Sequence, residues 1–539
     1  MKLVVIGSGP SGIHFAYTAL ERGHEVTLVD MGLSGTDIPH PKASFFDLKQ
    51  NHPDPVSYFL GDNYDAISLP AAHPGEQGEY YGLPPSKNHV FEHPSRFQFR
   101  SSGMDLLLSF AAGGLAEAWT GGAYPFNDGD LAAFGFGHDR MAPHYAKIAE
   151  RIGVGGAGDD LEQWYPAHEG LGEPIELNEG NRRLLDKYER KRARLNHKHP
   201  NVRLGRSRQA ALSHDLGDRD GCQQCGRCLW GCPNGAFYTP SLTLRGLLAH
   251  PNLTYLPGRF ASHFEAHSAR GLDALIAYNE TGAEEKISGD AFVLACGTIS
   301  TSNIFLRTIY KSRNEIVQLP GIMDNQQVLA PFLNLGMFGR GYFEKSYQYH
   351  QLAMGLAGET PEDFVHCQIT SMTTASAHPI ISQMPLGMAA GRKVFTALRS
   401  ALGVVNLNFS DTRRSENILT LDPEFGSDWP GLKLQYRSPP GQKAKIKAAL
   451  KQLGKFMNDL GAPFVPGMTQ IRTPGGSVHY SGTLPISASG GEFTVTEQCQ
   501  SNDFENLFIV DGSVFPSLPS KNLTLTLMAN ATRVATEAF

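Results

Sequence analysis

A chain of 539 residues is longer than one hydrophobic core usually organises, so its length predicts two intertwined domains. The formal net charge of -6 gives the chain no overall basic field, which makes nucleic acid and anionic membranes poor default partners. The sequence has no uninterrupted run of eighteen apolar residues and no leader before its first strand, so we expect no membrane span and a cytoplasmic protein that acts on small molecules.

The first thirty residues follow the order strand, glycine turn, helix, strand. Apolar residues 3–6 precede the turn, a helix is expected over 13–22 and a second strand over 25–29, and the turn itself reads Gly7-Ser8-Gly9-Pro10-Ser11-Gly12. In such a motif Gly7 permits the tight turn, Gly9 lets the backbone approach a pyrophosphate, and Gly12 lets helix and strand pack closely. The helix start at Pro10 and Ser11 is expected to face the anion. Asp30, at the end of the second strand, is placed to accept hydrogen bonds from a ribose diol, so the motif predicts a dinucleotide site.

A basic stretch covers residues 187–198. Its cations are Lys187, Arg190, Lys191, Arg192, Arg194 and Lys198. It could guide an acidic partner or a phosphorylated substrate, but a run of this kind is more commonly the solvated face of a helix. We therefore leave it outside the predicted site.

Four of the seven cysteines lie within residues 221–236. Cys222, Cys225, Cys228 and Cys232 reproduce the CxxCxxCxxxCP spacing of bacterial ferredoxins, which predicts an iron–sulfur cluster. The last cysteine of such a run serves a second cluster in two-cluster ferredoxins, and no second run occurs here, so the cluster takes either all four thiolates or three. Zinc and a reduced or disulfide-linked thiol loop are the alternatives, although paired zinc knuckles are normally well separated.

Three short segments between residues 400 and 440 alternate apolar and polar residues. The segments 404–409, 417–421 and 432–436 are expected to be strands of a half-buried antiparallel sheet. Residues 443–460 are expected to form an amphipathic helix with Ile446, Leu450, Leu453 and Met457 on one stripe.

Several segments resemble the glucose-methanol-choline (GMC) oxidoreductases. The strongest likeness lies in residues 506–516 and 522–531, which resemble the C-terminal segment of this family. Residues 290–299 resemble the strand and turn that return the chain to the FAD domain, and 113–122 resemble the second glycine-rich flavin segment. Residues 477–483 resemble the motif that carries the family's active-site histidine.

The resemblance implies an α/β protein (α+β overall), with a Rossmann-type FAD-binding domain and an interleaved antiparallel-sheet substrate domain. Residues 1–45, 200–315 and 472–539 would form the FAD-binding domain, 46–199 and 316–471 the substrate domain and flavin-covering segments, and 221–236 the cysteine-rich cluster loop. The antiparallel sheet would lie over the flavin, where members of the family select their substrates.

The resemblance also assigns site residues. It implies that Asp511 and Gly512 touch the ribityl and pyrophosphate part of FAD, and that the helix after Pro519 points its amino end at the flavin pyrimidine edge. Further residues that would contact the cofactor are Gly113, Gly114, Trp119, Asn522 and Thr524.

By the same resemblance, His479 is the catalytic base and Asn522 its partner. Alcohol oxidation by a flavin needs a base near the hydroxyl, and an imidazole changes protonation near working pH. Asn522 cannot titrate but can donate a hydrogen bond to the substrate oxygen.

We therefore expect FAD-dependent oxidation of an alcohol, with a sugar or glycoside hydroxyl as one candidate. Some sugar-oxidising members of the family carry an iron–sulfur cluster, in which case electrons would leave toward a protein or a quinone. Two alternatives remain open, namely a lyase that keeps FAD without cycling it and an electron-transfer subunit of a larger complex.

Overall fold

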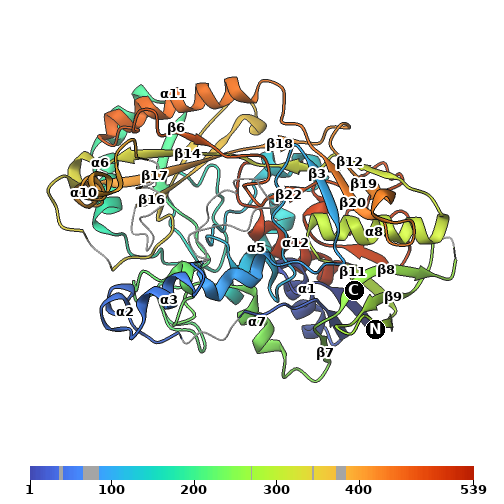
Figure 1. The fold of residues 1–539 in the computed structure, drawn as a ribbon. Helices are drawn as coiled ribbons and strands as arrows, with labels where there is room; N and C mark the ends of the chain where they lie inside the picture. Colours follow the sequence, from blue (N-terminus) through green and yellow to red (C-terminus); the bar gives the residue numbers. More distant parts are fainter. Residues whose placement is uncertain (36–39, 65–83, 269, 343–344, 372–380, 382–383) are drawn as a thin grey trace.

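The computed structural model describes residues 1–35, 40–64, 84–268, 270–342, 345–371, 381 and 384–539. Its fold is α/β, with a parallel sheet near the two chain ends and a broad antiparallel sheet beside it (Figure 1). The termini lie close together, because the ring of Phe539 packs edge-on against that of Phe15 at 5.6 Å between centroids.

The parallel sheet is built from segments far apart in the chain. Its order is β23-β11-β1-β2-β7, with bounds β23 Leu507–Ile509, β11 Ala291–Leu294, β1 Lys2–Ile6, β2 Glu25–Val29 and β7 Leu253–Leu256. These strands are short apolar runs, as expected of strands buried on both faces. The predicted strand, turn, helix, strand order at the N-terminus is confirmed.

Helices from the two ends of the chain pack beside this sheet. Helix α1 packs against α12, which in turn packs against α5. The helices of this region are α1 Pro10–Glu21, α5 His138–Ile152, α7 Pro240–Leu247, α8 Thr298–Arg313 and α12 Thr524–Glu537. A three-stranded antiparallel sheet of β8 Phe260–Ala266, β9 Leu272–Tyr278 and β10 Glu284–Ser288 packs on α8 through β8.

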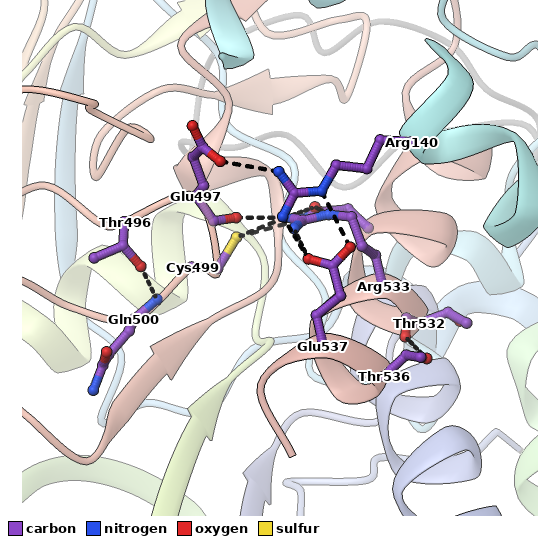
Figure 2. Close-up of polar contacts among 10 residues, drawn as sticks. Arg140, Thr496, Glu497, Cys499, Gln500, Thr532, Arg533, Thr536 and Glu537 are labelled. Atoms are coloured by element: carbon purple, nitrogen blue, oxygen red, sulfur yellow. Dashed lines mark hydrogen bonds and ion pairs between the residues drawn. The ribbon is translucent and has the colours of Figure 1, made fainter. Parts of the chain in front are cut away.

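Ion pairs fix the last turn of α12 (Figure 2). Arg533 is fully buried and donates from Nη1 to Glu537 Oε2 at 2.9 Å and from Nη2 to the Glu497 carbonyl at 2.7 Å. Arg140 of α5 donates to the same Glu537 carboxylate at 2.7 Å and to Glu497 Oε2 at 2.9 Å. These contacts attach α12 to α5 and to the segment before β23.

The broad antiparallel sheet has six strands in the order β21-β14-β17-β16-β15-β6. Their bounds are β21 Gln470–Ile471, β14 Gln326–Leu333, β17 Leu402–Phe409, β16 Val365–Ser371, β15 Leu352–Leu356 and β6 Val202–Arg206. One face is apolar and belongs to a core that also includes residues of α6 Glu179–Lys198 and α11 Gln442–Leu460. The other face carries Gln327, Gln368 and Asn406, which line a large cavity. Because successive side chains of a strand point to opposite faces, this sheet has one apolar face and one polar face.

The predicted strands between 400 and 440 exist, but they belong to two sheets rather than one. The first lies in β17, whereas the other two are β19 Ile418–Asp422 and β20 Gly431–Gln435 of a separate four-stranded sheet. That sheet also contains β12 Gln318–Pro320 and β3 Phe99–Ser102. Alternation reports which face of a strand is buried but not which strand is its neighbour, so the sequence could not separate the two sheets. The predicted helix over 443–460 is confirmed as α11.

The remaining elements are short. Two-stranded pairs join β13 Met323–Asp324 to β22 Tyr480–Ser481, β18 Asp411–Thr412 to β24 Ser517–Leu518, and β4 Val154–Gly155 to β5 Leu171–Gly172. Further helices are α2 Phe45–Asn51, α3 Pro55–Leu60, α4 Asp128–Leu131 and α10 Met388–Leu398. Short 3-10 turns are η2 Pro85–Phe91, η3 Gly114–Glu117, η4 Ala132–Phe134, η5 Cys228–Trp230, η6 Leu335–Met337, η7 Pro361–Asp363, η8 Pro423–Phe425 and η9 Gly512–Val514. Within the described ranges, no helix is long and apolar enough to cross a membrane.

Candidate active site

One cavity gathers most of the predicted site residues. Its wall includes Gly7, Gly9, Pro10, Ser11, Asp30, Gly114, Trp119, His479, Asp511, Gly512, Asn522 and Thr524. Gly12 and Gly113 lie beside this cavity without lining it, and the four cysteines line another cavity. Residues from both ends and the middle of the chain therefore meet at one place.

The glycine turn leaves the start of α1 open toward the cavity. Gly7 has a φ of +101°, and an added Cβ would lie 2.7 Å from the Ala295 carbonyl oxygen. A Cβ on Gly12 would lie 1.9 Å from the Gly7 carbonyl oxygen, so only glycine can pack behind the turn at this position. Gly9, the N-cap residue of α1, has no side chain that could cap the helix amides, and the first turn of α1 contains no acidic residue. Its backbone amides are thus available to an anion, as a cofactor pyrophosphate requires.

Asp30 is held at the edge of the cavity by its neighbours. Its carboxylate accepts from the Gly32 amide at 3.2 Å, from the Ser8 amide at 3.2 Å and from the Ser8 hydroxyl. Burial raises the pKa of Asp30 to about 6. The Ser8 oxygen also accepts from the Gly113 amide at 2.9 Å, which ties the first glycine motif to the second. These residues fit the adenosine end of FAD, and Ser8 was not singled out by the sequence because serine in a turn is common.

We expect Asp30→Ala to weaken FAD retention, because it removes the acceptor for the ribose diol. Replacing one hydrogen bond to a charged group costs about 1.5–3 kcal/mol, so the dissociation constant for FAD should rise by at least about 10-fold. Equilibrium dialysis of the purified protein against FAD measures this change. Ser8→Ala is the matched control, since it removes a contact to Asp30 but leaves the carboxylate. An unchanged affinity in Asp30→Ala would show that this carboxylate does not bind the ribose.

The loop that carries His479 is anchored by Asp324. The Asp324 carboxylate accepts from the Gly475 amide at 2.8 Å and from the Ser477 hydroxyl at 2.5 Å. The Ser477 oxygen in turn accepts from the His479 amide at 2.9 Å. Val478 has a φ of +60°, a conformation that β-branched residues rarely adopt and that occurs where surrounding contacts enforce it. The strained backbone immediately precedes the ring that enters the cavity.

The His479 ring is oriented by Asn325. Asn325 Nδ2 donates to the carbonyl oxygens of Phe409 at 2.9 Å and Pro519 at 3.1 Å, so its Oδ1 is the atom that faces His479 Nδ1 at 3.0 Å. An amide oxygen only accepts, and Nδ1 must therefore carry the proton. Burial, followed by the charge of Arg472, lowers the pKa of His479 to about 4. The neutral ring then keeps its lone pair on Nε2, which is the state that a general base needs.

Asn522 is oriented in a similar way by the polar face of the six-stranded sheet. Gln368 Nε2 donates to Asn522 Oδ1 at 2.7 Å and to His350 Nε2 at 3.1 Å. Burial lowers the pKa of His350 to about 3, so its Nε2 accepts at neutral pH. With its oxygen held by Gln368, Asn522 presents Nδ2 as its donor group, and the His366 side chain interacts with the same amide. Asn522 precedes α12, whose first residue Thr524 also lines the cavity.

Asp511 lines the same cavity and is held by several donors. Its carboxylate accepts from the Gly297 amide at 3.0 Å and from the hydroxyls of Thr301 at 2.5 Å and Ser513 at 2.6 Å. Burial raises the pKa of Asp511. Because the carboxylate already accepts several hydrogen bonds, it fixes the turn at Gly512 and the start of α8 against each other.

Sequence reasoning missed the polar strand residues that line this cavity. Gln327, Gln368 and Asn406 come from β14, β16 and β17, and Gln368 lies opposite Asn406 across the ladder. Among the described residues Asn406 Oδ1 has no hydrogen-bond partner although it is buried. In the sequence these residues are amides at positions that alternate with apolar residues, where a strand normally faces solvent. Amides are so common at such positions that they do not indicate a site.

The four cysteines line one small cavity together with Phe237 and Tyr347. The Gln224 amide approaches Cys222 Sγ at 3.4 Å, and the Gln348 amide approaches Cys228 Sγ at 3.5 Å. Within the described part of the chain, however, no group of three or more His, Cys, Asp or Glu side chains is arranged to hold a metal ion. The cysteines are therefore gathered, but they do not form a preassembled metal site.

Comparison with known proteins agrees with this geometry. Residues 413–531 match the family described as GMC oxidoreductase. No curated protein sequence matches the chain significantly.

The fold is shared with solved oxidase structures. Pyridoxine 4-oxidase from Mesorbium loti is similar with a TM-score of 0.60 and 14% identity, over 99% of this chain and 98% of that one. A formate oxidase variant from Aspergillus oryzae RIB40, studied for its effect on FAD modification, has a TM-score of 0.60 and 13% identity, over 99% and 97% of the two chains. A further formate oxidase structure has a TM-score of 0.59 and 13% identity, over the same shares. Residues 413–531 are thus similar to the GMC oxidoreductase family, and the chain as a whole shares its fold with these solved oxidases.

Proposed function

We propose that this enzyme oxidises the alcohol group of a small, polar substrate, with His479 as the base and Asn522 as the donor to the substrate oxygen. The observation that supports the proposal is the shared cavity, because residues of the dinucleotide motif, His479 and Asn522 all line it. A sugar or glycoside hydroxyl is the substrate class that we favour, because amide side chains of the sheet line the same wall and both donate to and accept from hydroxyls.

FAD would be held by the α1 amino end, Asp30 and the Asp511–Gly512 turn, and when bound it supplies a hydride acceptor. The protein's own residues handle the proton. His479 Nε2 takes the hydroxyl proton, and the Asn325 contact keeps Nδ1 protonated so that Nε2 is the only basic atom of the ring. Asn522 Nδ2 donates to the alcohol oxygen, because Gln368 holds Asn522 Oδ1. Asn325 thus acts through His479 and Asn522 acts on the substrate, and neither amide changes its protonation.

Anaerobic addition of candidate alcohols to the FAD-loaded protein tests the proposal. An alcohol substrate should bleach the oxidised flavin spectrum and release the corresponding carbonyl compound. A lyase would instead cleave a cyanohydrin while the flavin stays oxidised. A subunit that only relays electrons would be reduced by a protein donor but by none of the alcohols.

We also propose that the cysteine loop holds an iron–sulfur cluster when iron and sulfide are supplied. Two observations support it, namely the shared cavity and the two backbone amides that approach the sulfur atoms of Cys222 and Cys228. A third is proximity, since the Trp119 ring that lines the cofactor cavity lies 6.3 Å from the Phe237 ring, which lines the cysteine cavity. A cluster at this place would supply one-electron transfer, which suits a dehydrogenase with a protein or quinone acceptor.

Protein produced anaerobically with iron should contain iron and sulfide and absorb broadly beyond the flavin bands. Cys225→Ser should remove this absorption while the alcohol still reduces the flavin. Cys367→Ser, which changes a buried cysteine elsewhere, is the matched control and should leave the absorption intact. Zinc in place of iron, or folded protein without metal, would contradict the cluster and leave a thiol loop.

A further inference from the structure

Positive charge is concentrated on the two helices that cover the apolar face of the six-stranded sheet. Helix α6 contains eight Lys or Arg and three Asp or Glu, and α11 contains five Lys and one Asp. The two helices together carry a net charge of +9 in a chain whose total is -6. The rest of the protein is therefore acidic, and the overall charge conceals a strongly basic face.

Most of this basic face is exposed, and much of it is not neutralised. Within the described ranges, the following cations of α6 and α11 are exposed and have no ion-pair partner: Arg190, Lys191, Arg194, Lys443, Lys447, Lys451 and Lys455. Burial, and then the charges of Lys191 and Arg190, lower the pKa of Lys187. These seven like charges thus have no counter-ion in the described part of the protein, and their mutual repulsion disfavours leaving the face without a bound partner.

Exposed apolar side chains border the basic face. The turn η6 and the residue before it are hydrogen-bonded to α6 and to the segments that follow α10 and α11. Asn334 Nδ2 donates to the Gly180 carbonyl in α6 at 3.0 Å, and the Leu335 amide donates at 3.0 Å to the carbonyl of Gly461 just after α11. The Ser400 hydroxyl, just after α10, donates to the Met337 carbonyl at 3.3 Å. Leu335 is nevertheless 50% exposed and Phe338 46% exposed.

Helix α10 extends this apolar border. Met388 is 56% exposed, and Leu386, in the segment that leads into the helix, is 48% exposed. The cations Arg392 and Lys393 are exposed on the same helix, and the sequence has no acidic residue from 364 to 410. Figure 1 shows α6, α10 and α11 on the same side of the molecule, away from α7 and α8.

We propose that this end of the protein, formed by α6, α10, α11 and η6, docks on an anionic phospholipid bilayer. Anionic headgroups complement the unpaired lysines and arginines, and each such residue near an anionic membrane contributes on the order of 5-fold in affinity. The four apolar residues Leu335, Phe338, Leu386 and Met388 enter the interfacial layer. All four are between 46% and 56% exposed, whereas docking on a soluble acidic protein would favour a polar, complementary surface. Charge and apolar insertion together supply the two signals that stable peripheral binding requires.

Flotation of the FAD-loaded protein with lipid vesicles tests this proposal. We expect binding to vesicles of phosphatidylcholine mixed with phosphatidylglycerol, none to phosphatidylcholine alone, and weaker binding as salt is added. The triple variant Lys191→Glu, Arg194→Glu and Lys451→Glu should lower the partition coefficient by about 100-fold or more. Its matched control is Arg22→Glu, Arg245→Glu and Lys311→Glu, which makes the same change of net charge at exposed positions of the FAD side. This control should bind as the wild type does.

The role of the apolar border is tested by Phe338→Ser with Met388→Ser, which should weaken vesicle binding most at high salt. FAD content and flavin reduction report that all variants are folded. Equal loss in the two triple variants would mean that only total charge matters, and would overturn the proposal. So would unchanged vesicle binding in the double serine variant together with equally tight binding to polyglutamate, because these results would identify an acidic protein as the partner.

Discussion

His479→Ala should slow the anaerobic reduction of the flavin by substrate by about 100-fold or more, the usual scale for loss of a general base. The structure gives the reason, because Asn325 accepts from His479 Nδ1 and leaves Nε2 as the basic atom. Stopped-flow absorbance measures this half of the reaction. Reoxidation of the reduced enzyme by an artificial acceptor should change far less, since it needs no proton taken from an alcohol.

The pH dependence of the same rate constant distinguishes a base from a structural residue. Since the pKa of His479 is lowered to about 4, the ring is neutral at neutral pH, and the rate should fall only as the pH approaches that value. Asn325→Asp places a carboxylate beside Nδ1 and should raise the pKa of His479, which moves the acid limb of the profile to higher pH. A rate that drops equally at every pH, with no displacement of the limb, would contradict the assigned role of Asn325.

Arg533→Met should lower the stability of the folded protein by about 3 kcal/mol, because it removes a buried charge and leaves several acceptors unsatisfied. The Glu497 carbonyl and Asn530 Oδ1, now at 2.7 and 2.8 Å from Arg533 Nη2, would lose their donor. The other end of α12 lines the cofactor cavity, so loosening this helix should also release FAD. The denaturant midpoint, followed by flavin fluorescence, measures both effects.

Arg140→Met provides the matched control for Arg533→Met. The Arg140 side chain is 31% exposed and bonds the same Glu537 carboxylate, so solvent screening should limit its cost to less than about 1 kcal/mol. Equal shifts of the denaturant midpoint in the two variants would show that the stability contributed by each arginine does not depend on its burial.

The sequence predicted those parts of the fold in which local pattern and chemistry coincide. Gly7, Gly9 and Asp30 follow from the strand, turn, helix, strand order, and the dinucleotide-binding fold that this order predicts is observed. His479 and Asn522 were named through resemblance, and both line the cavity that the glycine turn also lines. Their catalytic roles and the domain boundaries remain predictions.

The supporting residues could not be found in the same way. Asn325 lies 154 positions before His479, and neither it nor Gln368 stands in a recognisable motif. The role of such an amide can be inferred only from its contacts. Those contacts depend on the pairing of β16 with β17 and on the loops that approach these strands. The separation of two sheets within residues 402–435 was missed for a related reason, because strand pairing over long distances leaves no local trace.

The two-faced sheet has a practical consequence for changing what the enzyme accepts. In β14, β16 and β17, residues that line the cavity alternate with residues that form the hydrophobic layer under α6 and α11. Libraries restricted to positions 327 and 406 can therefore vary recognition while the folding core stays fixed at 328, 367 and 405, and Gln368 is kept because it orients Asn522. Deleting a single residue from any of these strands would turn the cavity-lining residues toward the hydrophobic core and the core residues toward the cavity. Selectivity can therefore be changed by substitutions in these strands but not by insertions or deletions.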